Sequence, residues 1–381
     1  MSVMTFALSC GRRAVGALTR EARTELDARF RRRGRADLAV FHELEPPPTG
    51  GGHQFLRALL GELERRGLRV ELNRISTGTP ACLFNSFNFD FRRLRRFARP
   101  DCRMVHRVDG PLARYRGFDD GTDARIAAIN AELADATIVQ SRYSLEAHRE
   151  RGIELREPRL VPNAVDPAIF HPPAQRPSLR GRALRLIATS WSDNPRKGAD
   201  VLSWLDARLD WERFELTFVG RTSATLRRAR VLPPIPSHAV AEELRRHDVY
   251  VAASIDDPAS NALLEALACG LPALYRRSGG HPEVVGEGGV GFDGPEDVLP
   301  ALEQLASELA ERRGGGGGAG REGGWGGGRV VVGVGGVGFA GPSASRPALV
   351  PLGGALASRR AAIRVPSLQE VTDRYLEVLL G

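Results

Sequence analysis

Apolar and polar positions along the first part of the chain predict strands and helices in turn. A nearly uninterrupted apolar run over 37–43 predicts a strand, and apolar residues three and four positions apart over 53–66 predict a helix that ends at Gly67. A strand over 68–72 completes a βαβ unit, whose first loop contains Gly51 and Gly52. Further strands are predicted at 81–84, 104–107 and 136–140.

The same alternation begins again near residue 184. The strand predicted over 248–254 has almost no polar residue, which is typical of a parallel strand covered on both faces. A helix follows it, with Leu263, Leu264 and Leu267 on one side and Gly270 as its end. The other elements predicted here are strands at 184–189, 214–219 and 272–275 and helices at 199–209, 242–248 and 296–312.

Two stretches differ from these α/β patterns. Residues 1–35 are Arg-rich with helical spacing, and this helix could dock on the body of the protein, lie on a membrane surface or be frayed. Because glycine loses the most freedom on ordering, we expect disorder in the Gly-rich stretch 314–362. We therefore predict five parts: an extension (1–35), two Rossmann-like α/β domains (36–172 and 173–313), an insertion (314–362) and a C-terminal helix (363–381).

Composition limits the class of protein. The 381 residues suffice for two domains, and no apolar run approaches the ~18 residues that a membrane-spanning helix requires. The four cysteines lie far apart without a CxxC pair, so we expect neither a zinc site nor a disulfide framework, and a cytoplasmic location fits best.

The charge is strongly basic, at +8, and among the 54 basic residues Lys197 is the only lysine. Four arginines alternate with apolar residues over Phe91–Phe97. A segment of this kind suits peripheral contact with the anionic inner face of a membrane, or binding of a phosphorylated acceptor. The alternative is a helix face that is exposed to solvent. No helix-turn-helix, zinc finger or RNA-binding motif is present, so nucleic acid is not expected as a partner.

The turn after the central strand carries the most specific motif. Asp257 is followed after seven residues by Glu265 and then by Ala-Leu-Ala-Cys-Gly-Leu-Pro at 266–272. This run resembles the signature of family-four retaining glycosyltransferases, which have the GT-B fold of two Rossmann-like domains facing across a cleft. The resemblance implies that Asp257, where the family usually has Glu, contacts the donor sugar and that Glu265 binds the nucleotide ribose. The backbone N–H groups of Asn261 and Ala262 would bind the diphosphate, as helix starts do.

Other segments extend the resemblance. The loop 190–198 is similar to the family loop that binds the leaving diphosphate with two cations, and it keeps one of them as Lys197. Trp191 stands where the other cation is expected, so Arg196 or Arg221 would have to supply that charge. The loop with Gly51 and Gly52 would face the donor phosphates and the acceptor. An ordinary structural role is the alternative for each of these segments.

Three polar residues near strand ends and turns are further candidates. His106 lies at a predicted strand end, where the family often has a histidine that reaches the donor sugar, and Asp109 is beside it. A structural role in the core is the alternative for His106. The turn at 279–283 resembles a donor-facing turn of the family, in which Glu283 would contact the sugar or stabilise a helix start through its charge.

The resemblance predicts an enzyme that moves a sugar with retention from a nucleotide sugar, UDP- or GDP-linked, to an unknown acceptor hydroxyl on a glycan, lipid or small molecule. The first domain would hold the acceptor and the second the donor. His106, Lys197, Asp257 and Glu265 are the catalytic candidates, and no Asp-x-Asp motif indicates a metal or other cofactor. Two alternatives remain: a nucleotide-sugar-binding protein with weak or lost transfer, and an isomerase or phosphorylase of the same fold.

Overall fold

A computed structural model describes residues 36–47, 50–176, 181–310, 359–360 and 362–381. The extension predicted at 1–35 and nearly all of the insertion predicted at 314–362 lie outside these residues. The end of that insertion does not: Arg359 and Arg360 have helical backbone, and Arg359 Nη1 donates to the carbonyl oxygen of Gly289 at 2.6 Å.

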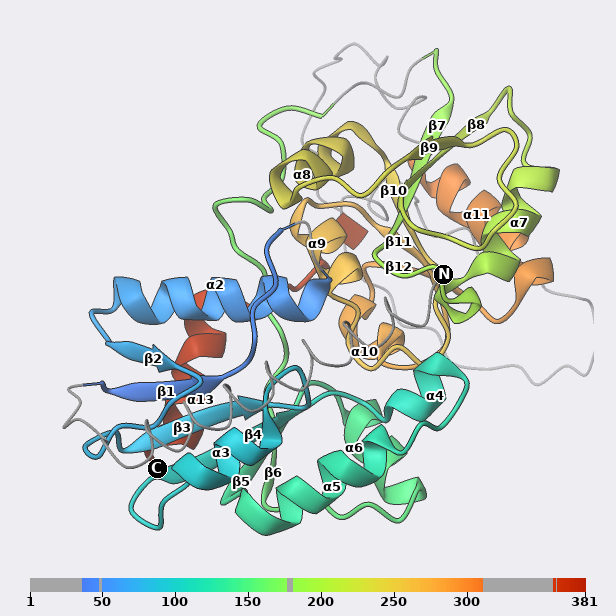
Figure 1. Cartoon of the computed structure of the whole chain (residues 1–381). Helices are drawn as coiled ribbons and strands as arrows, with labels where there is room; N and C mark the ends of the chain where they lie inside the picture. Colours follow the sequence, from blue (N-terminus) through green and yellow to red (C-terminus); the bar gives the residue numbers. More distant parts are fainter. Residues whose placement is uncertain (1–35, 48–49, 177–180, 311–358, 361) are drawn as a thin grey trace, which may run out of the picture.

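The first domain contains a parallel sheet of six strands in the order β2-β1-β3-β4-β5-β6 (Figure 1). Its elements are β1 (Leu38–Phe41), α2 (Gly51–Arg65), β2 (Val70–Leu72), β3 (Ala81–Asn85), α3 (Phe91–Phe97), β4 (Arg103–Val108), α4 (Leu112–Arg116), α5 (Thr122–Leu133), β5 (Ala136–Val139), α6 (Arg142–Glu150) and β6 (Pro158–Leu160).

The second domain contains another parallel six-stranded sheet, in the order β12-β11-β10-β7-β8-β9. Its elements are β7 (Leu184–Ser190), the 3-10 turn η1 (Pro195–Lys197), α7 (Ala199–Arg208), β8 (Phe214–Gly220), β9 (Arg230–Leu232), α8 (Ser237–Arg246), β10 (Val249–Ala252), α9 (Asn261–Ala268), β11 (Ala273–Arg276), α10 (His281–Val285), β12 (Gly289–Phe292) and α11 (Pro295–Ala310). The predicted α/β class and parallel sheets are confirmed.

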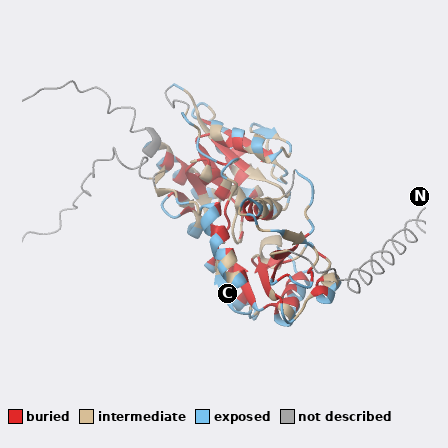
Figure 2. Cartoon of the chain, turned by 90° about the vertical axis from the view of Figure 1, so that its left-hand side faces the viewer, coloured by how far each residue is buried: buried red, intermediate tan, exposed pale blue. Residues whose placement is uncertain are grey.

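Each sheet is buried on both faces, and Figure 2 shows the buried residues gathered in the two sheets and the helices against them. Along β1, Leu38 and Val40 pack on the α2 side, whereas Ala39 and Phe41 pack toward α3 and α5. Because successive side chains of a strand point to opposite faces, a continuous apolar run covers both. In the second domain, α7 and α11 cover one face and α8 and α9 the other.

The predicted C-terminal helix is present as α13 (Leu368–Leu380), and it packs on the first domain (Figure 1). It begins with a capping box in which Ser367 Oγ accepts the backbone N–H of Glu370 at 3.1 Å. Its buried residues Leu368, Val371, Tyr375 and Leu379 join the cluster that includes Phe55 of α2. No helix in the described part of the chain combines the length and the apolar character that crossing a bilayer requires.

Candidate active site

A cavity of about 900 Å³ lies between the two domains. The second domain lines it with the ends of β7 and β10 and the turns that follow them, which is where parallel sheets bind ligands. The first domain contributes Gly50–Gly52, Asp109, the α4 region with Tyr115, Arg116 and Phe118, and Asn163. The structure thus brings together seven of the predicted site residues on one cavity: Gly51, Gly52, Asp109, Lys197, Asp257, Asn261 and Ala262.

The loop between β7 and α7 carries Lys197 to the cavity. The side chain of Asn194 caps the short turn η1 by accepting the backbone N–H of Arg196 at 2.9 Å. Gly198 ends the turn with a φ of +95°, and a Cβ atom there would lie 2.4 Å from the Cβ of Ala253. Only glycine therefore allows this turn to pass so close to the end of β10.

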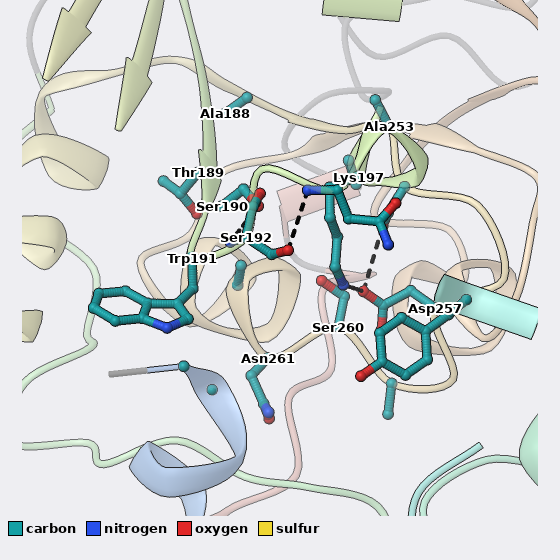
Figure 3. A pocket seen from close by; sticks show the side chains of 18 of the residues that line it. Ala188, Thr189, Ser190, Trp191, Ser192, Lys197, Ala253, Asp257, Ser260 and Asn261 are labelled. Atoms are coloured by element: carbon teal, nitrogen blue, oxygen red, sulfur yellow. Dashed lines mark hydrogen bonds and ion pairs between the residues drawn. The ribbon is translucent and has the colours of Figure 1, made fainter. Parts of the chain in front are cut away.

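Lys197 and Asp257 form an ion pair in which Nζ donates to Oδ2 at 2.7 Å, and Figure 3 shows the two side chains pointing toward each other. Burial alone would raise the pKa of Asp257, but the charge and hydrogen bond of Lys197, together with His281 and the backbone N–H of Ala259, outweigh burial and lower the pKa. Burial likewise opposes the charge of Lys197, and Asp257 more than compensates, so that its pKa is raised. Both groups are charged, and the Tyr115 ring lies 5.3 Å from Nζ.

Helix α9 begins at the wall of the cavity. Its N-cap is Ser260, whose Oγ accepts the backbone N–H of Leu263, and Asn261 and Ala262 form its first turn (Figure 3). A Cβ on Gly51 would lie 2.5 Å from the Cβ of Asn261, so the absence of a side chain lets α2 approach α9 closely. A helix start that faces a cavity offers N–H groups and a partial positive charge to an anion.

Glu265 lies one turn further along α9, outside the large cavity. It lines an adjoining cavity of about 110 Å³ together with Trp191, Gly220 and Ile235. Burial raises the pKa of Glu265 to about 8. A carboxyl group of this kind is largely protonated at neutral pH and can both donate a hydrogen bond to a hydroxyl group and accept one.

The structure contradicts the predicted position of His106. The side chain is fully buried on the α3 side of β4, stacked on Phe84 with the ring centroids 4.2 Å apart. Its Nδ1 accepts a hydrogen bond from Asn130 Nδ2 at 3.1 Å, and burial lowers its pKa to about 3. His106 is thus a neutral core residue that does not line the cavity.

The two arginines expected to replace the missing cation point elsewhere. Arg196 Nη2 donates to Asp256 Oδ2 at 2.5 Å, and Arg221 lies over the ring of Trp191, 4.8 Å from its centroid. Neither lines the large cavity, whose two lining cations among the described residues are Lys197 and Arg116. Figure 3 shows Trp191 pointing away from the ion pair of Lys197 and Asp257.

Glu283 lies outside the large cavity and stabilises a helix start, although the helix is in the other domain. Its carboxylate accepts the backbone N–H groups of Arg142 at 2.9 Å and of Tyr143 at 2.8 Å, at the first turn of α6. The alternative of a donor-facing role is therefore not supported by its position.

Beside His106, β4 carries a polar residue that sequence reasoning missed. Arg107 points to the other face of the sheet and is fully buried. Its Nη1 donates to Asn85 Oδ1 at 2.8 Å and to Asp109 Oδ1 at 2.9 Å, and its Nη2 donates to Asn163 Oδ1 at 3.0 Å. Asp109 and Asn163 both line the cavity, so Arg107 holds them from behind. An arginine within an otherwise buried strand was the available signal.

The Arg-rich segment predicted as a basic patch is helix α3. Leu94 and Phe97 are buried under it, Arg95 pairs with Glu132, and Arg93 Nε donates to the carbonyl oxygen of Asn73 at 2.8 Å. Contact of α3 with a membrane stays a prediction. Among the residues that the structure describes, no three His, Cys, Asp or Glu side chains are arranged as metal ligands.

Residues 186–310 match the sequence model of a family described as "Glycosyl transferases group 1". Two relatives are each named as the same subunit of phosphatidylinositol N-acetylglucosaminyltransferase. The protein from Arabidopsis thaliana is 29% identical over 166 residues, which are 39% of this chain and 36% of the relative. The one from Homo sapiens is 28% identical over 166 residues, 40% of this chain and 32% of the relative. The matched region thus spans about a third of each relative.

Solved structures share the arrangement of both domains. Sucrose-phosphate synthase from Thermosynechococcus elongatus superposes with a TM-score of 0.61 at 16% identity, over 90% of this chain and 98% of that one. HepE from Anabaena, in complex with UDP-glucose, superposes with a TM-score of 0.59 at 13% identity, over 89% and 98%. The predicted resemblance to family-four glycosyltransferases is thereby confirmed: the chain has the GT-B fold, and its second domain matches the glycosyl transferases of group 1.

Proposed function

We propose that this chain transfers a sugar from a nucleotide sugar to an acceptor hydroxyl, with retention at the anomeric carbon. One observation carries the proposal: a single cavity between the domains brings the ion pair of Lys197 and Asp257 next to the start of α9. Glu265 lines the adjoining small cavity. Lys197 and the start of α9 lie together, and Glu265 lies one turn further along α9. In a nucleotide sugar the diphosphate is next to the ribose, so the diphosphate would lie at Lys197 and the helix start, and the ribose near Glu265.

In this proposal, Lys197 and the N–H groups of Asn261 and Ala262 bind the diphosphate. The bond between the anomeric carbon and the phosphate oxygen breaks with negative charge growing on that oxygen, and a fixed cation and helix start lower the energy of this state. The acceptor oxygen forms the new bond on the same face of the sugar, and its proton leaves with the diphosphate. No protein nucleophile or metal is required for such a step.

Asp257 has two roles in this proposal, one before and one after the donor binds. Its carboxylate neutralises Lys197 until the diphosphate arrives, and it then becomes available to hydroxyl groups of the sugar. Glu265 contacts the ribose as a largely protonated carboxyl group, since its pKa is raised to about 8. The acceptor enters from the side of Tyr115 and Phe118, which line the cavity from the first domain.

The donor nucleotide is proposed from the relatives. HepE was solved with UDP-glucose, and the names of the two sequence relatives combine N-acetylglucosamine transfer with phosphatidylinositol. UDP-linked glucose and N-acetylglucosamine are therefore the first donors to assay, and an inositol phospholipid is the first acceptor. A lipid acceptor also agrees with the proposed peripheral membrane contact.

A second candidate function is nucleotide-sugar binding without transfer. It is favoured by Trp191, which stands at the position of an expected cation, and by Arg196 and Arg221, which do not line the cavity in its place. With less positive charge near the diphosphate, the departing group would be less stabilised. Binding without turnover in any acceptor screen would favour this function.

The test is a thermal-shift panel of UDP, GDP, ADP and their sugar conjugates with the wild-type protein and Lys197→Ala. Binding to the folded state raises the melting temperature, and we expect one nucleotide to do so in the wild type but not in the variant. Arg185→Gln is the control, because Arg185 lies at the opposite end of β7 and pairs with Glu215. Absence of any shift in a folded wild-type protein would rule out the proposal. Donor conversion without an acceptor would indicate an isomerase, or with phosphate a phosphorylase.

A further inference from the structure

A tyrosine of the first domain contacts the turn that carries Asp257. The hydroxyl group of Tyr143, at the start of α6, donates to Asp256 Oδ1 at 2.8 Å. Beside this contact, the Glu283 carboxylate of the second domain accepts the backbone N–H of Tyr143 itself at 2.8 Å. The start of α6 is therefore attached to the second domain at two adjacent points.

Asp256 has an unusual backbone conformation. Its φ is +54°, in the left-handed region that residues other than glycine rarely adopt. Its backbone N–H donates to Ser278 Oγ at 2.9 Å, and its other carboxylate oxygen accepts from Arg196. A strained residue with this many fixed contacts is held by its surroundings, which is common next to functional sites.

The contacts of Asp256 and Asp257 form a double ion pair between two loops. Arg196 pairs with Asp256 at 2.5 Å, and the next residue along each loop makes the second pair, Lys197 with Asp257 at 2.7 Å. The carbonyl oxygen of Arg196 also accepts the backbone N–H of Ile255 at 2.8 Å. The two pairs thus belong to one rigid unit, in which a shift of the outer pair moves the inner one.

We propose that Tyr143 is a positioning residue of the active site. Its hydrogen bond to Asp256 links the position of α6 in the first domain to the position of Lys197 and Asp257. The expected effect on turnover rests on the proposed function, whereas the hydrogen bond between Tyr143 and Asp256 does not.

The physical basis is the geometry of one hydrogen bond to a charged group. When α6 lies against the second domain, Tyr143 holds one oxygen of Asp256 while Arg196 holds the other. When α6 moves away, Asp256 loses the first contact and the strained turn can relax. The chemical step then proceeds at full rate only with the first domain closed, where the acceptor is held.

The uniqueness of Lys197 gives a direct test that needs no enzymatic activity. An amine-reactive ester modifies Lys197 and the α-amino group at the start of the chain, and peptide masses separate the two. We expect Tyr143→Phe to raise the rate of modification of Lys197 about threefold or more, because the inner pair opens more often. Tyr275→Phe is the matched control, since Tyr275 also loses only a hydroxyl group and lines none of the cavities described above.

The kinetic test separates positioning from binding. For Tyr143→Phe we expect kcat for donor turnover to fall about tenfold, the size of one hydrogen bond to a charged group, while the donor KM stays within about twofold. Asp256→Gly removes the carboxylate and suits the left-handed backbone. The double variant is expected to be no slower than Asp256→Gly alone, because both changes remove the same link.

The outcomes distinguish the two proposals. If wild-type protein binds no nucleotide, the proposed function fails, and the modification rate of Lys197 still decides whether the link exists. If the donor is turned over but Tyr143→Phe behaves as Tyr275→Phe in both assays, the inference is wrong and the function stands. Effects that multiply in the double variant would also overturn the inference.

Discussion

Asn163 Nδ2 in the first domain donates a hydrogen bond to Oδ1 of Asn261, the first residue of α9, at 3.0 Å. The other end of the Asn163 amide accepts from Arg107, so the orientation of the amide is fixed. Because the bond occupies the oxygen of Asn261, the NH₂ group is what this side chain can offer to an anionic ligand. The buried core of the first domain thus orients a residue at the diphosphate end of the proposed donor site.

Asn163→Asp tests this relationship with a change that conserves shape. The new carboxylate would face Asn261 Oδ1 without a proton to donate and would place a negative charge near the diphosphate. We expect the affinity for the nucleotide to fall about tenfold, as for a lost hydrogen bond with added repulsion. Isothermal titration measures it, and an unchanged Kd would show that the orientation of Asn261 does not matter for binding.

Lys197→Ala is expected to lower both nucleotide binding and stability. Removing Lys197 from this partly buried ion pair leaves the largely buried Asp257 carboxylate without its cation, which costs about 1–3 kcal/mol of unfolding free energy. Asp257→Asn in addition should restore most of the stability but not the binding. Urea denaturation and titration with nucleotide separate the two effects. Recovery of binding in the double variant would contradict the proposed role of Lys197.

Glu265 predicts a specific pH dependence. Its pKa is raised from the ordinary value of a glutamate to about 8 in the folded protein, so the folded state binds the proton more tightly than the unfolded chain. The stabilisation that comes from binding this proton is complete below the pKa of Glu265 in the unfolded chain. It is lost as the pH rises through the folded-state pKa of about 8. Glu265→Gln should therefore stabilise the ligand-free protein at pH 8 by about 1–3 kcal/mol and have little effect near pH 4. A uniform effect at both pH values in thermal denaturation would contradict this.

His106→Leu is expected to affect stability and not the donor site. The variant loses one of the two acceptors of Asn130 Nδ2 in the core, the other being Thr137 Oγ1, at a cost of about 1–3 kcal/mol of unfolding free energy. Because His106 does not line the cavity, the donor KM should stay within about twofold of wild type. A large increase in KM at unchanged stability would restore the role that the sequence suggested.

Glu283→Gln is expected to loosen the start of α6 by about 1 kcal/mol, because a charged acceptor of two N–H groups becomes a neutral one. Hydrogen exchange of the Arg142 and Tyr143 amides should become faster, by about fivefold. Glu287→Gln, in the turn after α10, is the control. Equal exchange rates in wild type and variant would mean that the contact contributes nothing in solution.

The motif-bearing loops and helix of the second domain could be read from the sequence for identifiable reasons, although its strands β9 and β12 were not predicted. Gly270 ends α9 with a φ of +74°, which only glycine adopts readily, and Asp257, Glu265 and Lys197 lie at fixed spacings within single loops and helices. Signals of this kind lie within short stretches of sequence, so they can be recognised without knowledge of the tertiary structure.

In the first domain the strands β1 to β5 were predicted, but the residues that support the site were harder to place, and β4 shows why. His106 and Arg107 are neighbours in a strand buried on both faces, so apolar periodicity does not indicate which of them faces α2 and which faces α3. The prediction chose His106, whereas Arg107 supports the cavity residues. The contact of Tyr143 with Asp256 spans 113 positions and has no local signature at all.

Helix α13 has a consequence for the order in which the chain acquires its structure during synthesis. The strands of the second domain come from one continuous stretch, 184–310, to which Phe170 and the partly buried Ile363 and Val365 add side chains. The first domain, although translated earlier, needs Tyr375 and Leu379 from the other end of the chain to complete the cluster around Phe55. The first domain can therefore complete this cluster only after the second domain has been made. Until then, part of the apolar surface around Phe55 stays uncovered.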